Sequence, residues 1–107
     1  MPQLDHDRVF AALAGRSRRR LLDRLFAGDG LTLGALCRRR GMSRQAVSKH
    51  LAILERAGLV VAHWQGREKL HYLNPVPLHE IHTRWIAKFQ APRLEALQGL
   101  KTALERK

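Results

Sequence analysis

Five polar residues gather at the start of one amphipathic segment near the middle of the chain. They are Ser43, Arg44, Gln45, Ser48 and Lys49. Arginine can pair with guanine through two hydrogen bonds and glutamine can pair with adenine in the same way, while serine and lysine can contact bases or phosphates. On a helical wheel Arg44, Gln45, Ser48 and Lys49 lie on the opposite side from the apolar side chains of the segment. The pattern predicts contact with the major groove of DNA, with Ser43 as the N-cap of the helix.

Four further cationic residues are candidates for contact with DNA. They are Arg16, Arg18, Arg67 and Lys69. Arg16 and Arg18 belong to the first turn of a predicted helix, where a cation opposes the helix dipole at about 0.3–1 kcal/mol. A phosphate docked at that helix end would explain them, because free backbone N–H groups favour anions there. An ordinary solvated arginine patch is the alternative explanation.

Candidate metal-binding, redox and catalytic residues form weaker patterns. His79 and His82 can share one face of a helix and could bind zinc, but no second cluster of ligands follows them. We therefore expect no metal and no other cofactor, and keep a zinc-responsive protein as an alternative. Cys37 lies on an apolar stripe, which predicts a buried thiol, and its redox role is left open. The sequence contains no Gly-rich phosphate loop, nucleophile elbow or His-Glu-x-x-His motif. We therefore do not expect the protein to be an enzyme.

Charge and composition narrow the classes of protein further. The chain has 107 residues, with 20 Lys and Arg against 9 Asp and Glu, a formal net charge of +11 and 45% hydrophobic residues. These numbers favour one folded domain, residues 1–107, with a polyanionic partner. No apolar run is long enough to span a membrane, and the first ten residues lack the apolar stretch of a secretory signal. With its single cysteine, the chain is expected to be cytoplasmic and to bind nucleic acid rather than a membrane.

Apolar periodicity and glycine positions place these residues on elements of structure. Side chains that recur every three or four residues predict helices, and glycines mark where the helices end. The predicted helices span residues 5–14, 16–27, 32–41 and 43–58. A turn of three residues, 41–43, separates the third helix from the fourth, which is typical of helix-turn-helix proteins. Two alternating segments, 59–65 and 69–74, predict a β-hairpin, or wing, whose tip is formed by residues 66–68.

Residues 78–107 are predicted to be helical, with more apolar surface than one small core can cover. Leucines recur at helical spacing between Leu94 and Leu104. Such a surface on a small domain predicts a partner subunit. Pro92 either kinks one long helix or occupies the first turn of a second one. We therefore divide the domain into a DNA-binding core, residues 5–77, and a C-terminal dimerisation segment, residues 78–107.

Residues 31–60 resemble the DNA-binding core of the ArsR/SmtB family of bacterial winged-helix repressors. The family motif S-x-x-x-V-S-x-H-L-x-x-L-x-x-A-G-L-V is matched by Ser43, Val47, Ser48, His50, Leu51, Leu54, Ala57, Gly58, Leu59 and Val60. The resemblance implies a mainly α winged helix-turn-helix with a small β-hairpin. It also implies a homodimer, paired through its first and last helices, that represses transcription at a near-palindromic operator. The interface residues expected on this basis are Val9, Leu78, Ile81, Trp85, Phe89 and Leu97.

The chain departs from the family pattern at two places. Metal sensors of the family typically carry a Cys-x-Cys pair in the third helix, where Cys37 stands alone. Gly15 and Arg16 replace the Asp-Pro that typically starts the second helix. The helical wheel also places His50 among apolar neighbours, so we expect it to be half-buried and not to contact bases. The remaining alternatives are a non-specific architectural DNA-binding protein and a membrane-surface or protein-binding module that uses the C-terminal helix.

Overall fold

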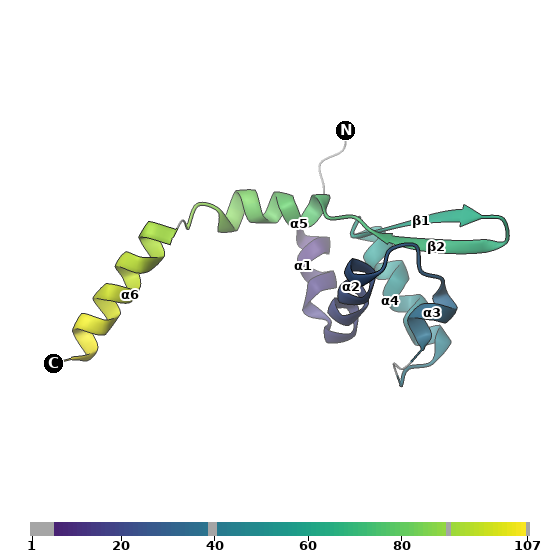
Figure 1. Cartoon of the computed structure of the whole chain (residues 1–107), viewed down its shortest axis with the longest axis horizontal. Helices are drawn as coiled ribbons and strands as arrows, with labels where there is room; N and C mark the ends of the chain where they lie inside the picture. The colour runs from purple at the N-terminus through teal and green to yellow at the C-terminus, as the bar shows by residue number, and fades with distance from the viewer. Residues whose placement is uncertain (1–5, 39–40, 90, 107) are drawn as a thin grey trace. The chain divides into compact units, whose positions relative to one another are not determined.

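Short helices and a β-hairpin form the first of the two units into which the chain divides (Figure 1). The computed structural model describes residues 6–38, 41–89 and 91–106, and the two units are residues 1–77 and 78–107. Residue 5, the predicted start of the first helix, lies outside the described residues. The first unit contains α1 (His6–Ala14), α2 (Arg16–Ala27), α3 (Leu33–Cys37), α4 (Arg44–Arg56), β1 (Val60–Gln65) and β2 (Glu68–Leu73).

The core of this unit lies where α1, α2 and α4 meet. The side chains with no exposed surface include Val9 of α1, Leu21 and Leu25 of α2, and Val47 and Leu54 of α4. In α2 and α4 these positions are four and seven residues apart, so they share one face of their helix. Burial of such a side chain stabilises the fold by about 1.5–3 kcal/mol. The face of α4 that enters the core therefore determines which face stays outside.

Helices α3 and α4 are joined by a short turn, and each begins at a side-chain cap. Thr32 Oγ1 accepts a hydrogen bond from the Ala35 N–H at 3.1 Å. Ser43 Oγ accepts one from the Ala46 N–H, also at 3.1 Å. Each cap satisfies a free donor of the first turn, which is worth about 1 kcal/mol. Gly41 in the turn has a φ of 63°, which glycine adopts at little cost. The predicted helix-turn-helix is confirmed, with α3 shorter than expected.

The C-terminus of α4 leads directly into the hairpin. Gly58 has a φ of 79°, and its N–H donates to the Glu55 carbonyl at 3.0 Å. The Leu59 N–H donates to the Leu54 carbonyl at 2.9 Å. These two bonds form a Schellman motif, which ends a helix at a glycine in the left-handed conformation. Asn74 closes the other end of the hairpin, because its Nδ2 donates to the Gly58 carbonyl at 2.8 Å.

The wing is an antiparallel hairpin with a two-residue turn. Its outermost pair joins Gln65 to Glu68, which leaves Gly66 and Arg67 as the turn. The sequence predicted a tip of residues 66–68, and the structure corrects this by placing Glu68 in β2. Cross-strand hydrogen bonding extends further than side-chain alternation alone indicated.

The loop before α3 adds a third extended segment to the base of the wing. Leu31 forms an isolated antiparallel bridge with His71, in which the His71 N–H donates to the Leu31 carbonyl at 2.9 Å. Asp29 Oδ1 accepts a hydrogen bond from the Leu73 N–H at 3.2 Å. These bonds fix the base of the wing to the helix-turn-helix, while its outer half extends beyond them.

The second unit begins within α5 (Val76–Ile81) and continues through a short π-helix, η1 (His82–Ile86), to α6 (Ala91–Glu105). Pro92 lies in the first turn of α6, so it belongs to a separate helix and does not kink a continuous one. The large apolar side chains of α6 are 49–60% exposed, namely Leu94, Leu97, Leu100 and Leu104. In the part of the chain that the structure describes, no helix is long and apolar enough to cross a membrane.

Exposure divides the expected interface residues into two groups. Val9 and Ile81 are 0% and 6% exposed, so their side chains already belong to the interior of the chain. Leu78 is half-buried. The exposed members are Trp85, Phe89 and Leu97, with exposed fractions of 43%, 53% and 60%. These three have apolar surface available for a partner, whereas Val9 has none.

The left-handed conformation of Gly58 makes a testable contribution to stability. Replacing Gly58 by alanine should lower the free energy of unfolding by about 1–2 kcal/mol, because a Cβ opposes this conformation. Gly58→Asn should lower it less, since asparagine tolerates the left-handed region better. Urea unfolding followed by circular dichroism measures both variants. Equal midpoints for the alanine variant and the unchanged protein would contradict the assignment.

Candidate nucleic-acid interface

The residues predicted to read DNA lie on the solvent face of α4. The exposed residues at the start of this helix are Ser43, Arg44, Gln45, Ser48 and Lys49. The opposite face carries Val47, Leu51 and Leu54, which are buried. His50 is half-buried, as predicted from its place among apolar neighbours on the helical wheel. The predicted division of this helix into a core face and an exposed polar face is therefore confirmed.

An open cavity of about 520 Å³ lies between α4 and the wing. Helix α4 contributes Arg44, Ser48, Leu51, Ala52 and Glu55 to its lining. The wing contributes Trp64, Arg67, Glu68, Lys69 and His71. Four residues predicted to contact DNA from distant parts of the sequence thus meet at one cavity. They are Arg44, Ser48, Arg67 and Lys69.

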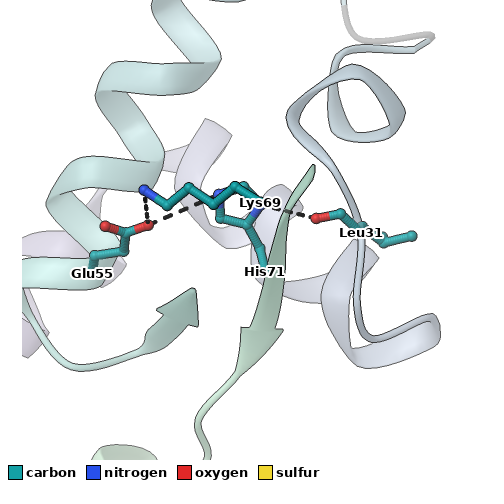
Figure 2. Close-up of polar contacts among 4 residues, drawn as sticks. All are labelled: Leu31, Glu55, Lys69 and His71. Atoms are coloured by element: carbon teal, nitrogen blue, oxygen red, sulfur yellow. Dashed lines mark hydrogen bonds and ion pairs between the residues drawn. The ribbon is translucent and has the colours of Figure 1, made fainter. Parts of the chain in front are cut away.

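A polar cluster joins α4 to the wing inside this cavity (Figure 2). Oε1 of Glu55 lies 3.5 Å from Nζ of Lys69 and 3.9 Å from Nε2 of His71. The buried His71 ring donates from Nδ1 to the Leu31 carbonyl at 2.8 Å. The same carbonyl also accepts the His71 backbone N–H, so both the ring and the backbone of this histidine are bonded to Leu31.

Three residues of the lining that lie in or beside the link between α4 and the wing were missed by reasoning from the sequence, namely Trp64, Glu55 and His71. Trp64 is 63% exposed and pairs across the hairpin with Lys69, two residues from the turn. The predicted hairpin register could have placed this tryptophan beside the cationic positions of the wing. Glu55 fell on the polar arc of α4 but carries the wrong charge for a phosphate contact. Its role depends on Lys69 and His71, which no local pattern connects to it.

Arg18 is occupied by contacts within the protein. Its guanidinium donates to the Ala12 carbonyl at 2.8 Å and to the Ala11 carbonyl at 3.2 Å. It also lies 3.2 Å from Nδ1 of His50. Arg18 therefore joins the last turn of α1 to α4, and the space it fills is space that a Cβ at Gly15 would enter. Contact between Arg18 and a DNA phosphate stays a prediction.

The remaining candidates do not gather with this group. Arg16 is exposed at the start of α2 and does not line the cavity, so its contact with phosphate also stays a prediction. His79 and His82 are both exposed in α5 and η1. Among the residues that the structure describes, no three histidine, cysteine or acidic side chains lie close enough together to hold a metal ion. Cys37 is half-buried rather than buried, which corrects the prediction made from its apolar stripe.

Known proteins resemble this chain in sequence. Residues 8–62 match the family described as "Helix-turn-helix domain". YuzN, an uncharacterised HTH-type transcriptional regulator of Bacillus subtilis strain 168, is 37% identical over 86 residues, which cover 75% of this chain and 94% of that protein. The transcriptional repressor SdpR of the same strain is 32% identical over 81 residues, which cover 76% of this chain and 88% of that protein.

The fold also matches a solved structure over most of its length. An ArsR-like transcriptional regulator from Rhodococcus sp. RHA1 aligns with a TM-score of 0.71 and 31% identity, covering 94% of this chain and 91% of that one. On this sequence and structural evidence, the chain belongs to the ArsR family of winged helix-turn-helix transcriptional regulators.

Proposed function

We propose that this protein is a homodimeric repressor that reads a near-palindromic operator with α4 and touches the adjacent groove or backbone with the wing. The observation that carries the proposal is the cavity that places Arg44 and Ser48 of α4 opposite Arg67 of the wing. Arg44 would pair with a base in the major groove, and Arg67 would contact the flanking minor groove or phosphates. Since its ligand would be the chromosome, we place the protein in the cytoplasm.

Charge and relatives support this proposal. A net charge of +11 attracts DNA without regard to sequence, and the exposed Gln45, Ser48 and Lys49 add groups able to discriminate bases. SdpR, which is matched over most of its own length, is a transcriptional repressor. The lone Cys37 separates this chain from the family's metal sensors that carry a Cys-x-Cys pair in the third helix.

The exposed leucines of α6 support a dimer. In water, an apolar stripe with side chains 49–60% exposed is unfavourable, and a second copy would cover it. A two-fold dimer would place its two α4 helices about 34 Å apart, one turn of DNA, and would therefore read a near-palindrome. Exposed Trp85 and Phe89 are further members of the proposed interface.

Selection of bound genomic fragments tests the proposed function directly. The purified full chain should enrich one or a few promoter fragments and should prefer them over random duplex by at least about 10³-fold at physiological salt. A protein that coats DNA through its charge would bind all fragments with similar affinity. Such a uniform result would replace the repressor by an architectural protein.

Replacing Arg44 by alanine tests the role of α4. The variant should bind the selected operator with about 1–3 kcal/mol less free energy and should lose discrimination at one base position of each half-site. Fluorescence anisotropy with operator and single-base variants measures both effects. Arg93→Ala removes the same charge from α6 and serves as the control, with little change expected in base preference. Equal effects of the two substitutions would contradict a reading role for Arg44.

Replacing Leu97 by glutamate tests the dimer. The charge should prevent burial of the α6 stripe, so the variant should sediment as a monomer and bind the operator at least about tenfold more weakly. Thr102→Glu adds the same charge about 140° around the helix and should leave the dimer intact. Analytical ultracentrifugation and DNA titration measure the two properties. A monomeric unchanged protein that binds the operator fully would exclude the dimer.

A further inference from the structure

Glu55 places a carboxylate on the surface that is proposed to bind DNA. It lines the same cavity as Arg44 and Arg67, and its side chain is 29% exposed. A negative charge at this place repels phosphates, so a surface shaped only by attraction for DNA would not carry it. The contacts of Glu55 point to a different role.

The Glu55 carboxylate connects α4 to the middle of the wing. Lys69 lies 3.5 Å and His71 3.9 Å from the same Glu55 oxygen. His71 is fixed at the base of the wing by its backbone and ring bonds to the Leu31 carbonyl. Lys69 lies two residue pairs closer to the turn, where it pairs with Trp64. Glu55 thus contacts a residue, Lys69, that lies closer than His71 to the turn of the wing.

The outer half of the wing has few other attachments. The side chains of Trp64, Gln65, Arg67 and Glu68 are all exposed. The side-chain hydrogen bonds of Asp29, Asn74 and His71 fix the hairpin to the rest of the first unit near its base. Among the described residues, the ion pair between Glu55 and Lys69 is therefore the outermost side-chain link between the wing and α4.

We propose that Glu55 is a positioning residue for DNA binding: it holds the wing against α4 through Lys69 and His71, so that Arg44 and Arg67 meet one duplex in a fixed relation. This inference rests on the proposed DNA-binding function. When Lys69 is paired with Glu55, it holds the wing against α4. The ammonium group of Lys69 also screens the Glu55 carboxylate from DNA phosphates. Pre-formed spacing between the two elements lowers the ordering cost of binding.

The sign of one substitution separates positioning from electrostatics. Glu55→Gln and Glu68→Gln each remove one negative charge from the cavity lining. Glu68 has no ion pair among the described residues and is the matched control. Electrostatics alone predicts tighter operator binding for both variants. Positioning predicts that Glu55→Gln binds about threefold to tenfold more weakly per dimer, while Glu68→Gln binds the same or more tightly. Tighter or unchanged binding by Glu55→Gln would overturn the proposal.

A double-mutant cycle connects the effect to the ion pair. Lys69→Met should weaken binding, and adding Glu55→Gln to it should cause little further loss, because one contact is removed by either change. Lys69→Arg keeps a cation that reaches Glu55 and should restore most of the affinity. Additive losses would mean that Lys69 and Glu55 act independently, which also contradicts the proposal.

Wing position can be followed without DNA. In a Trp85→Phe background Trp64 is the remaining tryptophan, and acrylamide quenching of its fluorescence reports its exposure. Glu55→Gln and Lys69→Met should both increase quenching, with thermal unfolding midpoints close to that of the background, whereas Glu68→Gln should not. Unchanged quenching in both would contradict a positioning role. Failure of the unchanged protein to select any operator would refute the proposed function, but this measurement would still decide the link between Glu55 and the wing.

Discussion

Burial of Val47, Leu51 and Leu54 determines the rotation of α4 about its own axis, and the DNA-facing surface depends on that rotation. A helix has one set of angular positions, so the residues that enter the core decide which others face outward. Arg44 and Ser48 reach the cavity because Val47 and Leu54 are buried on the opposite face of α4, while Leu51 is buried and also lines the cavity. The Ser43 cap and the Gly58 ending then set where the helix starts and stops.

Elements that follow from local sequence were predicted well. The caps at Thr32 and Ser43, the turn at Gly41 and the hairpin each arise from residues a few positions apart, so periodicity and propensity suffice to find them. The prediction that placed Glu68 in the tip of the wing was wrong by one residue, because strand pairing continues closer to the turn than side-chain alternation indicated. The wheel also placed His50 correctly, since its exposure depends on its own helix.

Features that depend on contacts between distant segments could not be predicted. Arg18 resembled one of several surface arginines, yet it bonds to the end of α1 and to His50, 32 positions away. Its guanidinium lies where a Cβ on Gly15 would stand, so a larger residue at position 15 would require the Arg18 side chain to move. Val9 looked available for a partner because a helical stripe does not reveal which of its members the chain covers itself.

The two-residue turn of the wing limits how this surface can change through evolution. Side chains alternate between the two faces of a strand, so the insertion of one residue in β1 would turn Trp64 to the opposite face. Only insertions that add two residues, or another even number, to each strand preserve the pattern, and two residues in each strand lengthen the hairpin by about 7 Å. The reach of the wing from α4 is therefore adjustable in steps rather than continuously. Relatives with longer or shorter wings would span discrete distances along a duplex, and point substitutions would be left to tune affinity within each length.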